Sequence, residues 1–146
     1  MVDPKVARLK TPAECESFIE NVKANHPELV LQARRRAVEL RAAAYGAKTE
    51  AEQDAIQAVH AAEAALTHRN GKKTRASRTW QSINRHGILG TVERVVTRRK
   101  ETEGYVVLAE LGMLDFSFEA VVLRHPTDFS AEAVQSAQDR LARRDA

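Results

Sequence analysis

Helix-start signals constrain the fold of this chain more than any other feature of its sequence. Two capping boxes, in which a threonine is followed three residues later by a glutamate, occur at residues 11–14 and 49–52. Pro27 suits the first turn of another helix, and Gly46 and Gly71 follow apolar residues that recur at the helical period. The helices that these signals predict span about residues 12–25, 27–46 and 50–70.

The second and third of these helices predict an antiparallel hairpin. Each has about 20 residues, so the hairpin would extend roughly 30 Å. Further along, the valine-rich segment 105–108 could form a strand, but Leu108 and Leu111 fit the helical period and no second strand is available to pair with it. We therefore predict an all-α fold: a long antiparallel helical hairpin, about residues 27–69, followed by a compact array of shorter helices.

Helical spacing continues beyond Gly71 in shorter segments. From about residue 75 to 85, Trp80 and Ile83 share one face of a predicted helix and arginines occupy another face. Residues 86–90 then predict a turn. The polar residues expected to cap later helices are Thr91, Asp115 and Ser130.

Charge is distributed unevenly along the chain, although its net value is only +3. Residues 1–71 carry ten basic and ten acidic side chains, residues 72–100 nine and one, and residues 101–146 four and nine. Because a solvated helix normally mixes both signs, residues 72–100 favour contact with an outside polyanion. Two alternatives stay open: neutralisation by the acidic C-terminal third, and a solvated surface whose arginine content reflects genome base composition.

The candidate binding residues are the lysines and arginines of this basic segment. Arg75, Arg78 and Arg85 are expected to make the principal contacts, because planar guanidinium groups bind phosphates and base edges. The cations expected to extend the electrostatic path are Lys72, Lys73, Arg98, Arg99 and Lys100. The apolar residues expected to hold this surface in place are Trp80, Ile83, Val92, Val95 and Val96.

A helix-turn-helix motif would make the binding sequence-specific. Residues 79–98 have roughly the right length, with Gly87 at the turn. The pattern fits poorly, because Ile83 stands where a small residue lets the helices approach and Glu93 stands at a position that should be apolar. Binding to the backbone without reading bases is the alternative.

Catalytic and metal-binding patterns are weak in this sequence. His60, Glu63 and His68 lack the spacing of known helical metal motifs, so hydrogen-bonded or solvent-facing side chains are expected there. Cys15 has no neighbouring base and no second cysteine to pair with. No glycine-rich phosphate loop occurs. We expect no catalytic residues, no metal and no cofactor.

The composition change after Gly71 suggests N-terminal helices and the hairpin over residues 1–71, and a basic helical segment packed with acidic C-terminal helices over 72–146. The two parts are expected to form one cooperative domain. No signal peptide and no membrane span is recognisable, so we expect a cytoplasmic protein without membrane partners.

The sequence therefore predicts a non-enzymatic nucleic-acid-binding protein, accessory or regulatory in role, with DNA favoured over RNA. The alternative is a helical protein–protein adaptor or assembly subunit, whose basic block pairs with its own or a partner's acidic surface. Self-association through the alanine-rich hairpin, as in a homodimer, belongs to that alternative.

Overall fold

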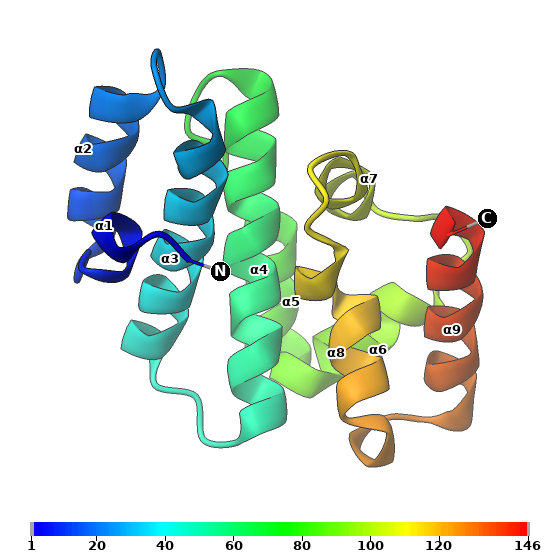
Figure 1. Ribbon diagram of the computed structural model, residues 1–146. Helices are drawn as coiled ribbons and strands as arrows, with labels where there is room; N and C mark the ends of the chain where they lie inside the picture. Colours follow the sequence, from blue (N-terminus) through cyan, green and yellow to red (C-terminus); the bar gives the residue numbers. More distant parts are fainter. Residues whose placement is uncertain (1, 146) are drawn as a thin grey trace. The chain divides into compact units, whose positions relative to one another are not determined.

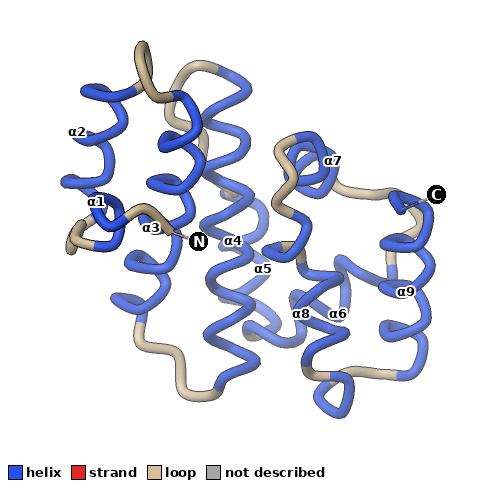
Figure 2. Tube along the Cα trace, viewed as in Figure 1, coloured by secondary structure: helices blue, strands red, loops and turns tan. Residues whose placement is uncertain are grey.

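The computed structural model describes residues 2–145, and within this range it contains helices and no strand (Figure 2). The predicted all-α class is confirmed. The chain divides into two compact units, Met1–Gly46 and Ala47–Ala146. The two long helices of the expected hairpin fall in different units, so their antiparallel packing stays a prediction.

The first unit consists of α1 (Pro4–Ala7), α2 (Pro12–Val22) and α3 (Pro27–Tyr45). The capping box at its start forms as predicted, because Thr11 Oγ1 accepts a hydrogen bond of 3.1 Å from the Glu14 amide. Helix α2 ends three residues before the predicted Asn25, and α3 ends at Gly46 with φ of 75°. In this unit α2 packs against α3 (Figure 1). The buried core residues of this pair are Cys15, Ile19, Leu29, Ala33, Ala37, Val38 and Ala42.

The second unit is assembled around the long helix α4 (Glu50–Asn70), which packs against α6, α7 and α8 (Figure 1). Thr49 caps α4 and Gly71 ends it in the left-handed conformation, as predicted. The remaining α-helices of the unit are α5 (Ser77–His86), α6 (Ile88–Thr97), α7 (Glu103–Glu110), α8 (Phe118–Arg124) and α9 (Ala131–Asp145). Two short 3₁₀ turns flank α8: η1 (Leu114–Phe116) and η2 (Pro126–Asp128).

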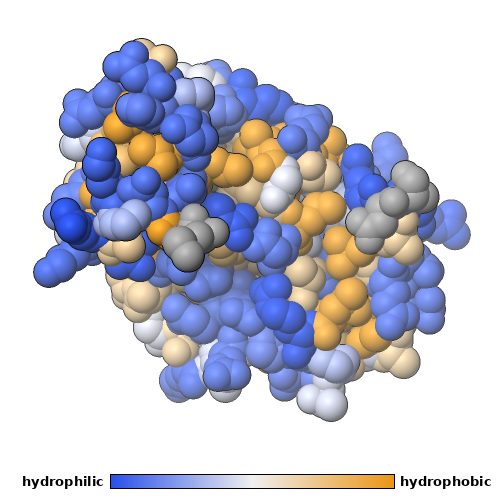
Figure 3. Space-filling view, in the orientation of Figure 1, coloured by the Kyte–Doolittle hydropathy of each residue, from blue (hydrophilic) through white to orange (hydrophobic). Residues whose placement is uncertain are grey.

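The core of the second unit contains small aliphatic side chains from α4, α6, α8 and α9. Its fully or nearly fully buried members are Ala55, Ala58, Val92, Val96, Val121, Val122, Ala133 and Ala137. Alanine at the contact positions lets the helices approach closely. On the face drawn in Figure 3 the surface is mostly polar, and apolar side chains gather where α7 and α8 lie. Val92 and Val96 of α6 belong to the core described above. Helix α6, in the second half of the basic segment, is therefore largely a core helix.

Two predicted caps differ from the structure. Thr91 does not begin a helix: it lies fully buried within α6, where its hydroxyl donates to the Gly87 carbonyl at 2.9 Å. Ser117, not Asp115, caps α8, since Ser117 Oγ accepts a hydrogen bond of 3.1 Å from the Ala120 amide. Ser130 caps α9 as predicted, through the Ala133 amide at 3.0 Å.

The boundary between compact units does not coincide with the composition change. Gly71 lies inside the second unit, because α4 before it packs against the helices that follow it. The division into residues 1–71 and 72–146 stays a prediction about domains. Across residues 2–145, no helix combines the length and the apolar character that crossing a membrane requires.

Candidate nucleic-acid interface

Helix α5 presents one continuous polar face to solvent. Its opposite side is anchored by Ile83, which is buried, and by Trp80, which is partly buried. The exposed positions recur at spacings of three, four and seven residues, which place them on one side of a helix. The exposed residues on this side are Ser77, Arg78, Gln81, Asn84 and Arg85, and one further exposed residue, His86, is the last of the helix. The helix contains no acidic residue.

These side chains are the types that contact nucleic acids. Arginine binds phosphate or guanine through its planar fork, while glutamine and asparagine can pair with adenine through their amides. The ten residues of α5 span about 15 Å, a length that fits a major groove. Sequence analysis missed Gln81 and Asn84, although their spacing from Arg78 and Arg85 places them on the same face.

All eight cations predicted from the sequence are exposed. Lys72, Lys73 and Arg75 precede α5, Arg78 and Arg85 lie on it, and the other three, Arg98, Arg99 and Lys100, directly follow α6. The structure brings Arg75, Arg78 and Arg98 together around one pocket of the second unit. Arg98 and Arg99 both line a second, more open hollow that also contains the acidic residues Glu132 and Asp139.

The start of the basic segment is held on α4 by two hydrogen bonds of Thr74, one to Thr67 and one from Asn70. The Thr74 amide donates to Thr67 Oγ1 at 2.9 Å, and the Asn70 side-chain amide donates to Thr74 Oγ1 at 3.1 Å. These bonds fix the centre of the connector between α4 and α5 on α4. Lys72 and Lys73, just before Thr74, are exposed.

Glu63 of α4 fixes the N-terminal end of α5. Its Oε2 accepts hydrogen bonds from the Ala76 amide at 2.9 Å and from the Trp80 indole at 2.8 Å. His60 Nδ1 lies 3.3 Å from the other carboxylate oxygen, and its ring contacts the Trp80 ring. Burial alone would raise the pKa of Glu63, but His60, the Trp80 indole and the Ala76 amide outweigh burial and lower this pKa. The carboxylate thus stays charged.

The other end of the basic segment is fixed by Arg140 of α9. Its side chain is only 2% exposed, and it pairs with Glu119 at 2.7 Å. Its guanidinium also donates to the Arg98 carbonyl and, at 3.4 Å, to the Val95 carbonyl, so it occupies acceptors at the C-terminal end of α6. Burial raises the pKa of Glu119, opposed by the hydrogen bond from Arg140.

Three acids of the C-terminal third pair with arginines outside the predicted site. Glu101 contacts Arg144 at 2.8 Å, Glu103 contacts Arg69, and Glu119 contacts the buried Arg140. Arg75 lies 3.8 Å from Glu63, but its side chain is 65% exposed, so this pair is weak. The ion pairs of these three carboxylates are therefore formed with Arg144, Arg69 and Arg140, and not with Arg75, Arg78 or Arg85.

The geometry of α5 and α6 differs from a helix-turn-helix. Gly87 alone separates the two helices, with φ of 80°, whereas the motif joins its helices by three or four residues. Glu93 of α6 binds the amide and hydroxyl of Ser130 at the start of α9, at 3.0 and 2.6 Å. Helix α6 is largely buried, whereas α5 exposes a polar face to solvent.

The weak catalytic candidates occupy structural positions. Cys15 is fully buried, and burial raises the pKa of its thiol despite nearby Arg36 and Arg41, so the thiol is protonated at neutral pH. His60 and Glu63 belong to the contact with Trp80. In the part of the chain that the structure describes, no group of three or more histidine, cysteine, aspartate or glutamate side chains could hold a metal ion.

No protein-family model, no curated protein and no solved structure matches this chain. Functional inference therefore depends on the geometry of the surface described above.

Proposed function

We propose that the protein binds nucleic acid, without catalysing a reaction, through the exposed face of α5 and the cations on either side of it. One observation carries this proposal: Arg78, Gln81, Asn84 and Arg85 share an exposed, acid-free helical face. The flanking cations add long-range attraction to a polyanion. An accessory or regulatory role follows from a surface that contains binding groups and no recognised catalytic constellation.

DNA is favoured over RNA as the partner. The major groove of B-form DNA admits an α-helix and exposes base edges that arginine, glutamine and asparagine can read. The major groove of A-form RNA is too narrow for the same contact. A short exposed helix such as α5, with cations before and after it, suits the major groove of B-form DNA.

The decisive experiment is a salt-titrated binding assay with duplex DNA, single-stranded DNA and RNA. We expect duplex DNA to bind most tightly, with affinity that falls steeply as salt rises. An Arg75→Ala/Arg78→Ala/Arg85→Ala variant should bind much more weakly, and its log–log salt slope should be shallower by about two to three, because each lost phosphate contact removes about 0.9.

A control variant with the same change in net charge separates local contact from overall charge. Lys5, Arg8 and Lys10 are exposed residues of the first unit, so replacing all three by alanine also removes three positive charges. This control should keep the wild-type affinity and slope. Equal binding by the wild type and the Arg75→Ala/Arg78→Ala/Arg85→Ala variant would refute the proposed surface and favour the adaptor alternative.

A further inference from the structure

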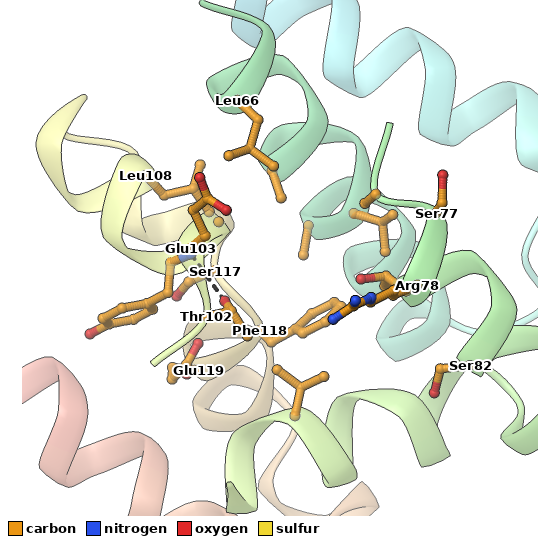
Figure 4. A pocket seen from close by; sticks show the side chains of 18 of the residues that line it. Leu66, Ser77, Arg78, Ser82, Thr102, Glu103, Leu108, Ser117, Phe118 and Glu119 are labelled. Carbon is orange, nitrogen blue, oxygen red and sulfur yellow. Dashed lines mark hydrogen bonds between the residues drawn. The ribbon is translucent and has the colours of Figure 1, made fainter. Parts of the chain in front are cut away.

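We propose that the pocket lined by α4, α5, α6, α7 and α8 binds a small amphipathic anion, with an apolar body and one carboxylate or phosphate head. The pocket has a volume of about 680 Å³, within the range of roughly 300–1,000 Å³ that small-molecule sites occupy. It lies entirely within the second unit. Figure 4 shows the side chains that line it.

The interior of the pocket is apolar. Helix α4 contributes small and aliphatic side chains, α7 contributes Leu108, and α8 contributes Phe118. The apolar lining from α4 and α6 is Ala58, Val59, Ala62, Leu66 and Val95. An alkyl or aromatic body can bury its surface against these groups, which is the main source of affinity for a ligand of this kind.

The charge of the lining selects an anion. The lining contains three arginines, Arg75, Arg78 and Arg98, and two carboxylates, Glu103 and Glu119. Both carboxylates already pair with arginines outside the lining: Glu103 with Arg69 and Glu119 with Arg140. The lining therefore has an excess of positive charge available to a ligand.

The position of Arg78 indicates where the head would bind. In Figure 4 the side chains of Arg78 and Phe118 extend toward one another across the pocket, from α5 and α8. A ligand whose body packs against Phe118 brings its anionic head to the Arg78 guanidinium, which can hold a carboxylate or phosphate through two parallel hydrogen bonds. Ser77 and Ser82 also line the α5 side of the pocket, and the Ser82 hydroxyl forms a hydrogen bond of 2.9 Å with the Thr91 hydroxyl.

A regulatory consequence rests on the proposed nucleic-acid function. Arg75, Arg78 and Arg98 belong both to the pocket lining and to the predicted nucleic-acid surface. A bound anion would neutralise arginines that DNA also needs, so each ligand should weaken the binding of the other by the same factor. The anion would act as a releasing effector.

The binding test uses decanoate and decyl phosphate, each below the concentration at which it forms micelles, with decyltrimethylammonium as a cation of the same chain length. Calorimetry and amide chemical shifts on the full chain should show saturable one-to-one binding of one or both anions, with shifts concentrated on residues 58–66 and 102–119. Failure of both anions to saturate at millimolar concentration, or equal binding of the cation, would overturn the proposal.

Variants test the two parts of the pocket separately. Arg78→Gln/Arg98→Gln should weaken anion binding at least about tenfold, since a hydrogen bond to a charged head is lost. Leu66→Trp, at a partly exposed position, should fill the pocket and abolish binding while helix content by circular dichroism is unchanged. The matched control is Arg94→Gln/Arg143→Gln, exposed arginines outside this lining, which should bind as the wild type does. Unchanged affinity in Arg78→Gln/Arg98→Gln would refute the assigned head site.

The test of decanoate and decyl phosphate binding does not depend on whether the protein binds nucleic acid. If the protein binds decanoate but no DNA or RNA, the proposed function fails and the pocket assignment stands. If it binds both, decanoate at saturation should reduce DNA affinity at least about fivefold, the lower end of ordinary coupling between sites. If decanoate saturates the pocket and DNA affinity does not change, the proposed coupling through the shared arginines is wrong. The two binding proposals would then still stand.

Discussion

Glu63 links the buried side of α4 to the exposed arginines of α5. Its carboxylate is 15% exposed and accepts two hydrogen bonds, from the Ala76 amide and the Trp80 indole. The first of these satisfies a donor at the start of α5, a helix whose preceding residue, Ala76, provides no side-chain cap. The orientation of Arg75 and Arg78 thus depends on an acid that does not belong to the basic segment.

Glu63→Gln should destabilise the protein by about 1–3 kcal/mol at neutral pH, because a neutral amide replaces a charged acceptor of two partly buried donors. Since the folded pKa of Glu63 lies below its ordinary value, its contribution is complete above the ordinary value near 4.5 and is lost as pH falls through the lower folded value. Urea unfolding at several pH values should show the difference between wild type and variant shrinking toward acid pH.

The control for this substitution is Glu110→Gln, at an exposed position on α7. It should leave the free energy of unfolding within about 0.5 kcal/mol of the wild-type value at every pH. A Glu63→Gln difference that stays constant down to pH values well below the ordinary pKa of glutamate would show that its charge does not stabilise the fold.

At single positions, the sequence predicted exposure better than it predicted pairing. The helical period alone placed Arg78 and Arg85 opposite Ile83, and the structure exposes both arginines and buries the isoleucine. Arg140, by contrast, is buried, although nothing in its local sequence distinguishes it from the exposed Arg143 and Arg144. Its partners are 21 to 45 residues away in the sequence, so local spacing has no information about them.

At the scale of elements, helix ends were predictable where a local cap exists. The hydroxyls of Thr49 and Ser130 accept hydrogen bonds from amides three residues ahead, so a short sequence pattern predicts these helix starts. The start of α6 was predicted wrongly at Thr91, because Gly87, with its positive φ, lets the chain turn in one residue and begin the next helix at Ile88. The threonine hydroxyl then bonds backward to Gly87 inside the helix.

The exposed face of α5 predicts a separation between affinity and specificity. Gln81→Ala/Asn84→Ala removes two amides without changing charge, so binding to unrelated DNA and the salt slope should stay the same. Binding to a sequence selected with the wild type should weaken by about 1–3 kcal/mol for each amide that contacts a base. Selection from a random duplex library, followed by titration of both proteins, measures this difference.

A matched control removes equivalent amides from other helices. Asn21 on α2 and Gln138 on α9 are both exposed, and replacing them by alanine should leave selected and unrelated DNA bound as by the wild type. If Gln81→Ala/Asn84→Ala binds the selected sequence as tightly as the wild type does, α5 contacts the backbone and does not read bases.

At the scale of the whole molecule, the change in charge along the chain and the division into compact units have different physical origins. The basic segment begins after Gly71, where surface side chains change sign. The compact unit begins at residue 47, because the apolar side of α4 packs against α6, α7 and α8. Contacts of this kind join different helices of the chain, so composition along the chain could not reveal them.

The second unit contains every part of the proposed interface. All eight predicted cations, the exposed amides of α5 and the side chains of Glu63 and Arg140 lie within residues 47–146, which also have their own buried core. A chain truncated to residues 47–146 should therefore keep its helix content and bind duplex DNA within about twofold of the full protein, with the same salt slope. Circular dichroism and the salt-titrated assay measure both quantities.

The control is the same truncation with Arg75, Arg78 and Arg85 replaced by alanine, which should lose affinity as the full-length variant does. If the truncated chain folds but binds more than tenfold more weakly, residues 1–46 supply contacts to the nucleic acid, and the interface extends beyond the basic segment.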